Sequence, residues 1–160
     1  MQVSISKVGF ADWSQLLDLV RASFAYMDTR IDPPSSLAMM GVDEFKAKAA
    51  EESLIIAQEG QTILGCAFAA LRDDCVYVGK VAVAQTARGH GIARAIFNAA
   101  EELARKHGRA FLELQTRVEL VENHATFAAL GFEKVAETAH AGYSRPTSIT
   151  MRRRVHKSAS

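Results

Sequence analysis

The sequence has few of the features that would cross-link a chain or attract it to a charged surface. Only two of its 160 residues are cysteines, Cys66 and Cys75. Two cysteines are too few for a disulfide framework and favour a reducing, cytoplasmic location. Basic and acidic residues nearly balance, at 19 and 18, so no global field for nucleic acid or an anionic membrane is present. We therefore expect neither a nucleic-acid partner nor a membrane partner.

Long apolar segments are also missing. The longest uninterrupted apolar run, from Cys66 to Leu71, is far shorter than the ~20 residues that a membrane-spanning helix requires. The first ten residues lack a basic stretch followed by an apolar one, so no signal peptide is expected. Hydrophobic residues make up 49% of the chain and charged residues 23%, which is typical of a globular domain. We expect one domain over 1–155 and a short tail over 156–160.

Apolar periodicity predicts alternating helices and strands. Strands are predicted near 3–8, 53–58, 62–71, 75–84, 110–116, 132–138 and 147–155. Helices are predicted after Asp12 with Gln15 as its capping-box partner, within 36–52 with a break at Gly41, after Gly91, and from an Asn123 cap to Gly131. The order β-α-α-β-β-β-α-β-α-β-β describes a single-domain α/β fold, with helices flanking a mixed, mostly antiparallel sheet.

The segment from Val81 to Arg94 joins a strand to a helix through a turn that contains two glycines. The first four amides of a helix lack internal partners, and a Ser, Thr, Asp or Asn side chain usually covers one of them. Here Gly89 and Gly91 leave the amides bare, and Arg88 and Arg94 flank them. An uncapped helix start between arginines favours phosphate or pyrophosphate binding. The alternative is a tight turn with no ligand.

Two other phosphate-binding motifs fit this segment poorly. Gly89-x-Gly91 begins a dinucleotide fingerprint, but Arg94 occupies the position of the third glycine. The segment also follows an antiparallel meander, whereas that fingerprint opens a βαβ unit. No Gly-Lys-Ser/Thr follows at the spacing of a P-loop. A nucleotide-binding oxidoreductase is therefore a disfavoured hypothesis.

The pattern Arg88-x-x-Gly91-x-Ala93 resembles the Arg/Gln-x-x-Gly-x-Gly/Ala signature of the GNAT N-acetyltransferase superfamily. The strand before it, at 81–83, and the short helix ending in Gly-Phe after it, at 123–132, resemble the neighbouring features of that family in the same order. The resemblance implies a GNAT-like fold and acetyl-CoA as the acyl donor. It also implies that the fourth and fifth strands splay apart to admit the pantetheine arm.

By this resemblance, the bare amides bind the pyrophosphate of acetyl-CoA and the preceding strand binds pantetheine as an added strand. The residues expected to bind the cofactor are Val81, Ala82, Val83, Arg88, Gly89, His90, Gly91, Ile92, Ala93, Arg94, Asn123 and Phe127. The five histidines show no metal-ligand spacing, so no metal is expected.

The usual acid and base of the family do not transfer to this chain. Many members carry a tyrosine four residues before the Gly-Phe pair, where this chain has Phe127, and a glutamate on the fourth strand, where it reads Val78-Gly79-Lys80. In the polar loop between the last two strands, we predict Tyr143 as the acid and His140 as the base. Alternative bases are Glu113 and Glu137.

The acceptor is expected near the loop that follows the first helix, a region that walls the acceptor cleft in this family. The residues predicted to bind it are Arg30, Glu113 and Arg117. We expect direct transfer of acetyl from acetyl-CoA to a primary amine of a small molecule, amino acid or peptide in a ternary complex. The protein would act as a monomer or homodimer. The alternative is an acyl-CoA-binding module of the same fold with little or no catalysis.

Overall fold

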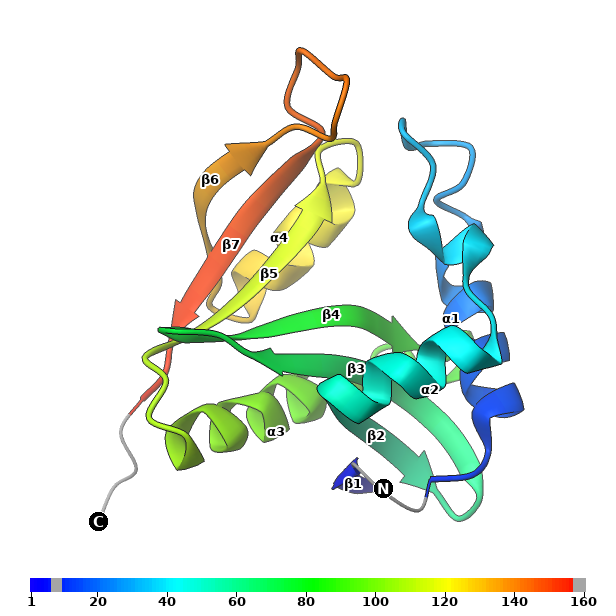
Figure 1. Ribbon diagram of the computed structural model, residues 1–160. Coiled ribbons are helices and arrows are strands. Elements are labelled where there is room, and N and C mark those ends of the chain that lie inside the picture. The colour runs from blue at the N-terminus through cyan, green and yellow to red at the C-terminus, as the bar shows by residue number, and fades with distance from the viewer. Residues whose placement is uncertain (7–9, 157–160) are drawn as a thin grey trace.

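The computed structural model describes residues 1–6 and 10–156, and its elements follow the order predicted from the sequence (Figure 1). The strands are β1 (Gln2–Ser6), β2 (Ser53–Glu59), β3 (Thr62–Leu71), β4 (Cys75–Val83), β5 (Phe111–Arg117), β6 (Glu133–Thr138) and β7 (Ser148–Arg154). The helices are α1 (Trp13–Ala25), α2 (Val42–Glu51), α3 (Ile92–Lys106) and α4 (Val121–Ala129), with short 3-10 helices η1 (Ser36–Met39) and η2 (Gln85–Ala87). The predicted α/β fold class is confirmed.

The seven strands form one sheet in the order β1-β2-β3-β4-β5-β7-β6. All neighbours are antiparallel except β4 and β5, which are parallel. Side chains alternate between the two faces of a strand. Ile55 and Ala57 accordingly pack with α3, whereas Leu54 and Ile56 pack with α1 and α2. The sheet is therefore covered by helices on both faces.

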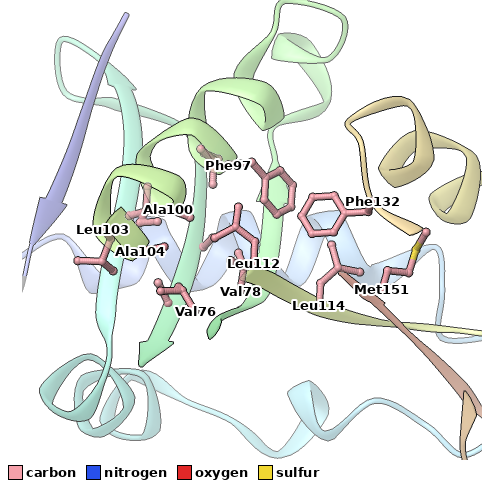
Figure 2. Packing of buried hydrophobic residues seen from close by; sticks show 14 of the residues in the cluster. Val76, Val78, Phe97, Ala100, Leu103, Ala104, Leu112, Leu114, Phe132 and Met151 are labelled. Atoms are coloured by element: carbon pink, nitrogen blue, oxygen red, sulfur yellow. The ribbon is translucent and has the colours of Figure 1, made fainter. Parts of the chain in front are cut away.

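The core on the α3 face joins the two halves of the sheet. Figure 2 shows Phe97 of α3 and Phe132 beside each other, above Leu112 and Leu114 of β5 and close to Met151 of β7. The rings of Phe97 and Phe132 meet edge-on with centroids 5.1 Å apart. All five side chains are buried. This packing fixes β5 and β7 against α3, although β4 and β5 pair over only a short part of their length.

The split in the sheet lies between β4 and β5. These strands pair only from Cys75 to Tyr77, opposite Phe111 to Glu113, and then diverge (Figure 1). Opposite β3, β4 carries one extra residue between Gly79 and Ala82, and Lys80 has a positive φ of 52°. A bulge of this kind bends a strand and re-aims its side chains. The splaying of the fourth and fifth strands that the resemblance implied is confirmed.

Some local predictions need correction. Helix α4 begins after Leu120, so Asn123 lies in its first turn and does not cap it. Asp12 does cap α1. In a capping box, the Gln15 side chain would accept a hydrogen bond from the backbone N–H of Asp12. Here the side-chain amide of Gln15 instead donates to the Asp12 carboxylate. Val8, placed in the first strand, lies outside the described residues.

Two further features of the structure are the environment of the cysteines and the length of the helices. Cys66 and Cys75 are free and buried, and burial raises the pKa of the Cys66 thiol to about 12. Such a thiol stays protonated at neutral pH and is a poor nucleophile.

Within residues 1–6 and 10–156, no helix has the length and apolarity needed to cross a bilayer.

Candidate active site

A cleft of about 1250 Å³ opens at the split between β4 and β5. Its walls come from both strands, the start of α3, helix α4, the end of α1, the segment 31–36 and the loop between β6 and β7. Pockets of this volume are large enough for a cofactor together with a second substrate. The split therefore places most of the predicted site residues around one cavity.

The start of α3 lies at one end of this cleft. Gly91 is its N-cap, with φ 78° and no side-chain capping bond, and Gly89 has φ 81°. Within the described part of the chain, the amides from Gly89 to Arg94 donate to no protein acceptor. A Cβ at either glycine would meet nothing within 4 Å. The bare, open helix start that the sequence predicted is therefore present.

The two arginines beside this helix start are exposed and line the cleft. Arg88 and Arg94 make no ion pair within the described ranges, so their guanidinium groups are free to meet an anion. His90 is exposed between the glycines but is not among the side chains that line the cleft.

Close packing of α3 on β3 holds the helix start in place. Ile92, its first residue, is buried against Gly65 of β3. A Cβ at Gly65 would lie 2.7 Å from Ile92 Cγ2 and 3.0 Å from the carbonyl oxygen of Ala82, so only glycine fits there. Sequence reasoning missed this residue, because a glycine inside a strand pattern does not reveal which helix approaches it.

Beyond Tyr77, none of the strands in the described part of the chain pairs with β4 on the β5 side, and β4 residues 78–83 line the cleft. An extended arm of a ligand can therefore bind this edge as an added strand. The carbonyl of Val83 accepts a hydrogen bond of 3.2 Å from Ser23 Oγ of α1, a contact that the sequence did not suggest. Ala82 is buried, and Val81 and Val83 are half-buried.

Helix α4 supplies the opposite wall. Phe127 lines the cleft and also packs edge-on against Phe97, with ring centroids 5.9 Å apart. Asn123 lines the cleft too, and its Oδ1 accepts a 3.4 Å hydrogen bond from the hydroxyl of Tyr26. Phe127 thus joins the hydrophobic core to the ligand cavity and offers no proton.

Residues 30–36, here called the strap, cross from α1 to the β5 side of the cleft. Arg30 Nη2 lies 3.0 Å from Glu122 Oε2 on α4, and the Asp32 amide donates to Glu119 Oε2 at 3.1 Å. Arg117 donates through Nη1 to the carbonyl of Pro33 at 2.7 Å and through Nη2 to that of Pro34 at 3.3 Å. These contacts join the two halves of the sheet across the end of the cleft away from α3, which we call the acceptor end.

The strap changes the interpretation of Arg30. Its guanidinium pairs with Glu122 and is not among the groups that line the cleft. The hydrogen bond from Arg30 lowers the pKa of Glu122 to about 2, so this pair stays charged at any ordinary pH. Arg30 therefore ties the strap to α4, and the structure does not place it in the cleft where the acceptor was expected. Arg117, by contrast, does line the acceptor end.

Both predicted catalytic side chains reach the acceptor end from the loop between β6 and β7. The Tyr143 hydroxyl donates to Asp32 Oδ1 of the strap at 2.6 Å, which raises the pKa of Tyr143. His140 Nδ1 is hydrogen-bonded to Thr147 Oγ1. Desolvation by burial, followed by the nearby positive charge of Arg117, lowers the pKa of His140. His140 is therefore mostly neutral at pH 7.

The two alternative bases lie elsewhere. Glu113 sits where β4 and β5 are still paired, and its carboxylate binds Arg152 at 2.8 Å and Arg72 at 3.3 Å. Glu137 pairs with Lys134 on β6. Neither carboxylate is among the groups that line the cleft. Strand alternation turns the Glu113 side chain toward the arginines, so the structure does not place it in the cleft where the acceptor was expected.

The comparisons with known proteins agree with this geometry. The profile of the acetyltransferase (GNAT) family matches residues 13–132, and the chain belongs to that family. No curated protein sequence matches the chain.

Solved structures of N-acetyltransferases share the fold. The PaiA N-acetyltransferase from Thermoplasma acidophilum, solved in complex with coenzyme A, is 13% identical with a TM-score of 0.78, covering 96% of this chain and 99% of that one. The ribosomal-protein-S18-alanine N-acetyltransferase from Escherichia coli is 16% identical with a TM-score of 0.68, covering 99% and 97%. A GNAT-family acetyltransferase from Staphylococcus aureus is 11% identical with a TM-score of 0.72, covering 97% and 100%.

Proposed function

We propose that the protein is an N-acetyltransferase that moves the acetyl group of acetyl-CoA directly to a primary amine within a ternary complex. The observation that carries this proposal is the uncapped start of α3, which opens onto the free edge of β4 inside one cleft. Bare amides with Arg88 and Arg94 suit a pyrophosphate, and a free strand edge suits an extended arm with amide groups. A small molecule, an amino acid or a peptide would serve as the amine, and the protein would work as a monomer or homodimer in the cytoplasm.

The residues present fit acetyl-CoA as the co-substrate. The amides from Gly89 to Ala93, with the flanking arginines, would hold its pyrophosphate, and backbone groups of Val81 and Val83 would hold its pantetheine. When bound, acetyl-CoA supplies a thioester carbonyl that an amine can attack. A backbone N–H of the strand 81–83 is the donor best placed to stabilise the oxyanion that develops on this carbonyl.

His140 supplies the base in this proposal. Its lowered pKa leaves the imidazole neutral at pH 7, so it can accept the proton that the amine must lose, directly or through a water. The bond to Thr147 occupies Nδ1 and leaves Nε2 for that proton. The new N–C bond forms as the C–S bond breaks, and the leaving thiolate takes a proton from Tyr143 or from solvent.

Tyr143 has to release Asp32 before it can donate to the thiolate. Its single hydroxyl proton is used in the 2.6 Å bond to Asp32 Oδ1, and its raised pKa keeps that proton in place. A thiol of pKa about 8.5 is a tolerable leaving group without full protonation. Proton donation by Tyr143 is therefore an assisting step, and acyl transfer does not depend on it absolutely.

A binding module of the same fold is the second candidate. Phe127 and Gly79 occupy the positions where many family members carry an acid and a base, and Phe127 is part of the aromatic core. Such a module would bind acetyl-CoA in the same cleft and release little thiol. Amine-dependent release of free thiol from acetyl-CoA, measured with a pool of amines, separates the two candidates. Release favours the enzyme, and binding without release favours the module.

Thermal denaturation gives a first test of the cofactor. At 100 times its dissociation constant, CoA should stabilise the folded protein by about 2.7 kcal/mol. Pantetheine, which lacks the phosphates, should stabilise it clearly less, because the start of α3 would then have no anion. If millimolar CoA leaves the unfolding temperature unchanged, the cleft does not bind this cofactor. A shift with NADH but not with CoA would instead support the oxidoreductase hypothesis.

The pH dependence of the reaction tests His140. In the wild type, kcat/KM should fall on the acid side of an apparent pKa below 6.5, because protonated His140 cannot accept the proton of the amine. In His140→Gln only acceptor that is already neutral reacts, so with a peptide acceptor the acid limb should move up to the pKa of its terminal α-amino group, about 7.7–8.0. Rates at pH 7 should then fall about tenfold and recover at high pH. Identical profiles for the two proteins would remove His140 from the chemistry.

A further inference from the structure

Lys80 is a charged residue of the cleft that neither the sequence motifs nor the proposed chemistry uses. It lies at the bulge of β4, in a left-handed backbone conformation with φ 52°, and it is half-buried. Non-glycine residues rarely adopt positive φ, and such outliers persist only where the surrounding structure holds them. The bulge therefore holds the lysine side chain in the wall of the cavity.

The ammonium of Lys80 has little to balance it. Its hydrogen bond is a long one, 3.5 Å, to Ser36 Oγ of the strap. Among the residues that the structure describes, no carboxylate lies within ion-pair distance of it. The neighbouring Glu52 is paired with Lys48 at 2.7 Å. Desolvation by burial, followed by repulsion from Lys48, lowers the pKa of Lys80. A partly buried lysine is normally paired, so this one lacks its counter-charge.

Arg117 brings a second positive charge to the same end of the cleft. It holds the carbonyls of Pro33 and Pro34, whereas Lys80 contacts Ser36, so the two contacts are at most three positions apart along the strap. Extended chain of that length spans roughly 10 Å, which one small molecule can bridge. The positive charge of Arg117 also contributes to the lowered pKa of Lys80. Burial itself lowers the pKa of Arg117.

Two of the acidic groups around this end are already engaged. Glu122, the carboxylate among the cleft-lining side chains of the described ranges, pairs with Arg30. Asp32 accepts from Tyr143 and pairs with Arg145 at 3.1 Å. Glu119 accepts from the Asp32 amide through Oε2, its Oε1 is buried without a hydrogen-bond partner among the described residues, and it does not line the cleft. Among the cleft-lining side chains of the described ranges, a simple cationic amine would thus meet two positive charges and no unpaired carboxylate. An amine that also carries a negative charge would bring the missing counter-charge with it.

We infer that the acceptor is a small amine that also bears a carboxylate, as an amino acid does, and that Lys80 and Arg117 bind this carboxylate. The inference rests on the proposed function and narrows its substrate class. It also suits the chemistry, since two nearby positive charges disfavour the ammonium form of the acceptor and favour the neutral, attacking amine. The strap is tied to β5 and α4 across this end, which favours a small acceptor over a polypeptide segment.

Matched sets of acceptors test the inference. Each set contains a free amino acid, its carboxamide and its decarboxylated amine, and thiol release from acetyl-CoA gives kcat/KM for each. The free acid should be preferred by at least about tenfold, because only it forms charge-assisted bonds with both cations. In Lys80→Met this preference should largely disappear, because the rate on the free acid should fall by more than the rate on the carboxamide. Lys80→Arg should retain part of the preference.

Lys46→Met provides the control, because Lys46 is an exposed lysine of α2 outside the cleft and should behave as wild type. Equal rates on the acid and its carboxamide would overturn the inference and leave the N-acetyltransferase intact. So would an equal loss for every acceptor in Lys80→Met, which would place Lys80 in the chemistry. Transfer to the carboxamides or the decarboxylated amines but to no free acid would likewise contradict the inference. Acetyl-CoA binding without transfer to any acceptor would contradict the proposed function and favour the binding module. Failure to bind acetyl-CoA at all would also contradict the proposed function.

Discussion

Replacing Gly91 with aspartate should lower the affinity for CoA at least about tenfold, or ~1.4 kcal/mol, while the protein stays folded. Gly91 is the N-cap of α3, and the space beside its Cα is open to the cleft. An aspartate there adds a side chain and a negative charge where the pyrophosphate would bind. Its carboxylate would also accept from the amides of the helix start and compete with the phosphates for them. Isothermal titration with CoA measures the change.

Gly108→Asp is the matched control for this substitution. Gly108 follows the other end of α3 and has a positive φ of 67°, and a Cβ there would likewise meet nothing within 4 Å. Aspartate therefore meets a similar backbone strain at both sites, but only Gly91 faces the cleft. Affinity for CoA should be unchanged in Gly108→Asp. If Gly91→Asp bound CoA as tightly as the wild type, the phosphates would have to bind elsewhere.

Replacing Tyr143 with phenylalanine should lower kcat by roughly ten- to a hundredfold and leave CoA binding nearly unchanged. General-acid assistance is typically worth 10²–10⁴-fold, and a thiolate that leaves readily places the effect at or below the low end of that range. The change should appear in kcat because the hydroxyl meets the developing thiolate mainly in the transition state. Steady-state kinetics with saturating acetyl-CoA separates kcat from the KM of the acceptor.

The substitution Asp32→Ala distinguishes proton donation by Tyr143 from a purely structural role of its hydrogen bond. Tyr143→Phe and Asp32→Ala both break the 2.6 Å hydrogen bond between the loop and the strap, but only the first removes the hydroxyl. Proton donation by Tyr143 predicts a larger loss of kcat in Tyr143→Phe than in Asp32→Ala. Equal losses in the two variants would mean that the bond only holds the strap. A normal kcat with a raised KM for the acceptor would mean that Tyr143 contacts the acceptor alone.

Local signals in the sequence are enough to predict the cofactor end of the cleft. Gly89 and Gly91 can be predicted as part of the cofactor site because a helix start without a cap is recognisable from a few consecutive residues. The strand before them and the apolar stripe after them are equally local. The structure therefore matches the predicted strand, turn and helix from β4 to α3 closely.

The acceptor end could not be predicted in the same way, because its contacts join residues far apart in the chain. Asp32 meets Tyr143 across 111 positions, and Arg30 meets Glu122 across 92. No periodicity connects such pairs, so the sequence alone does not reveal that Arg30 holds the strap. The direction of Glu113 depends on the register between β5 and β7, which sets it opposite Arg152. A bulge with a positive φ at a lysine cannot be recognised in the sequence. From the sequence, Lys80 is therefore noticed only as part of the stretch 78–80, which lacks the glutamate of the family.

A crystal structure of the protein with bound CoA is the most direct test of how the cleft is used. The pyrophosphate should accept hydrogen bonds from the amides between Gly89 and Ala93, with Arg88 and Arg94 beside it. The pantetheine should lie along residues 81–83 of β4, and the thiol should point toward the acceptor end near His140 and Tyr143. A pyrophosphate bound away from the start of α3, or a pantetheine outside the split between β4 and β5, would contradict this assignment.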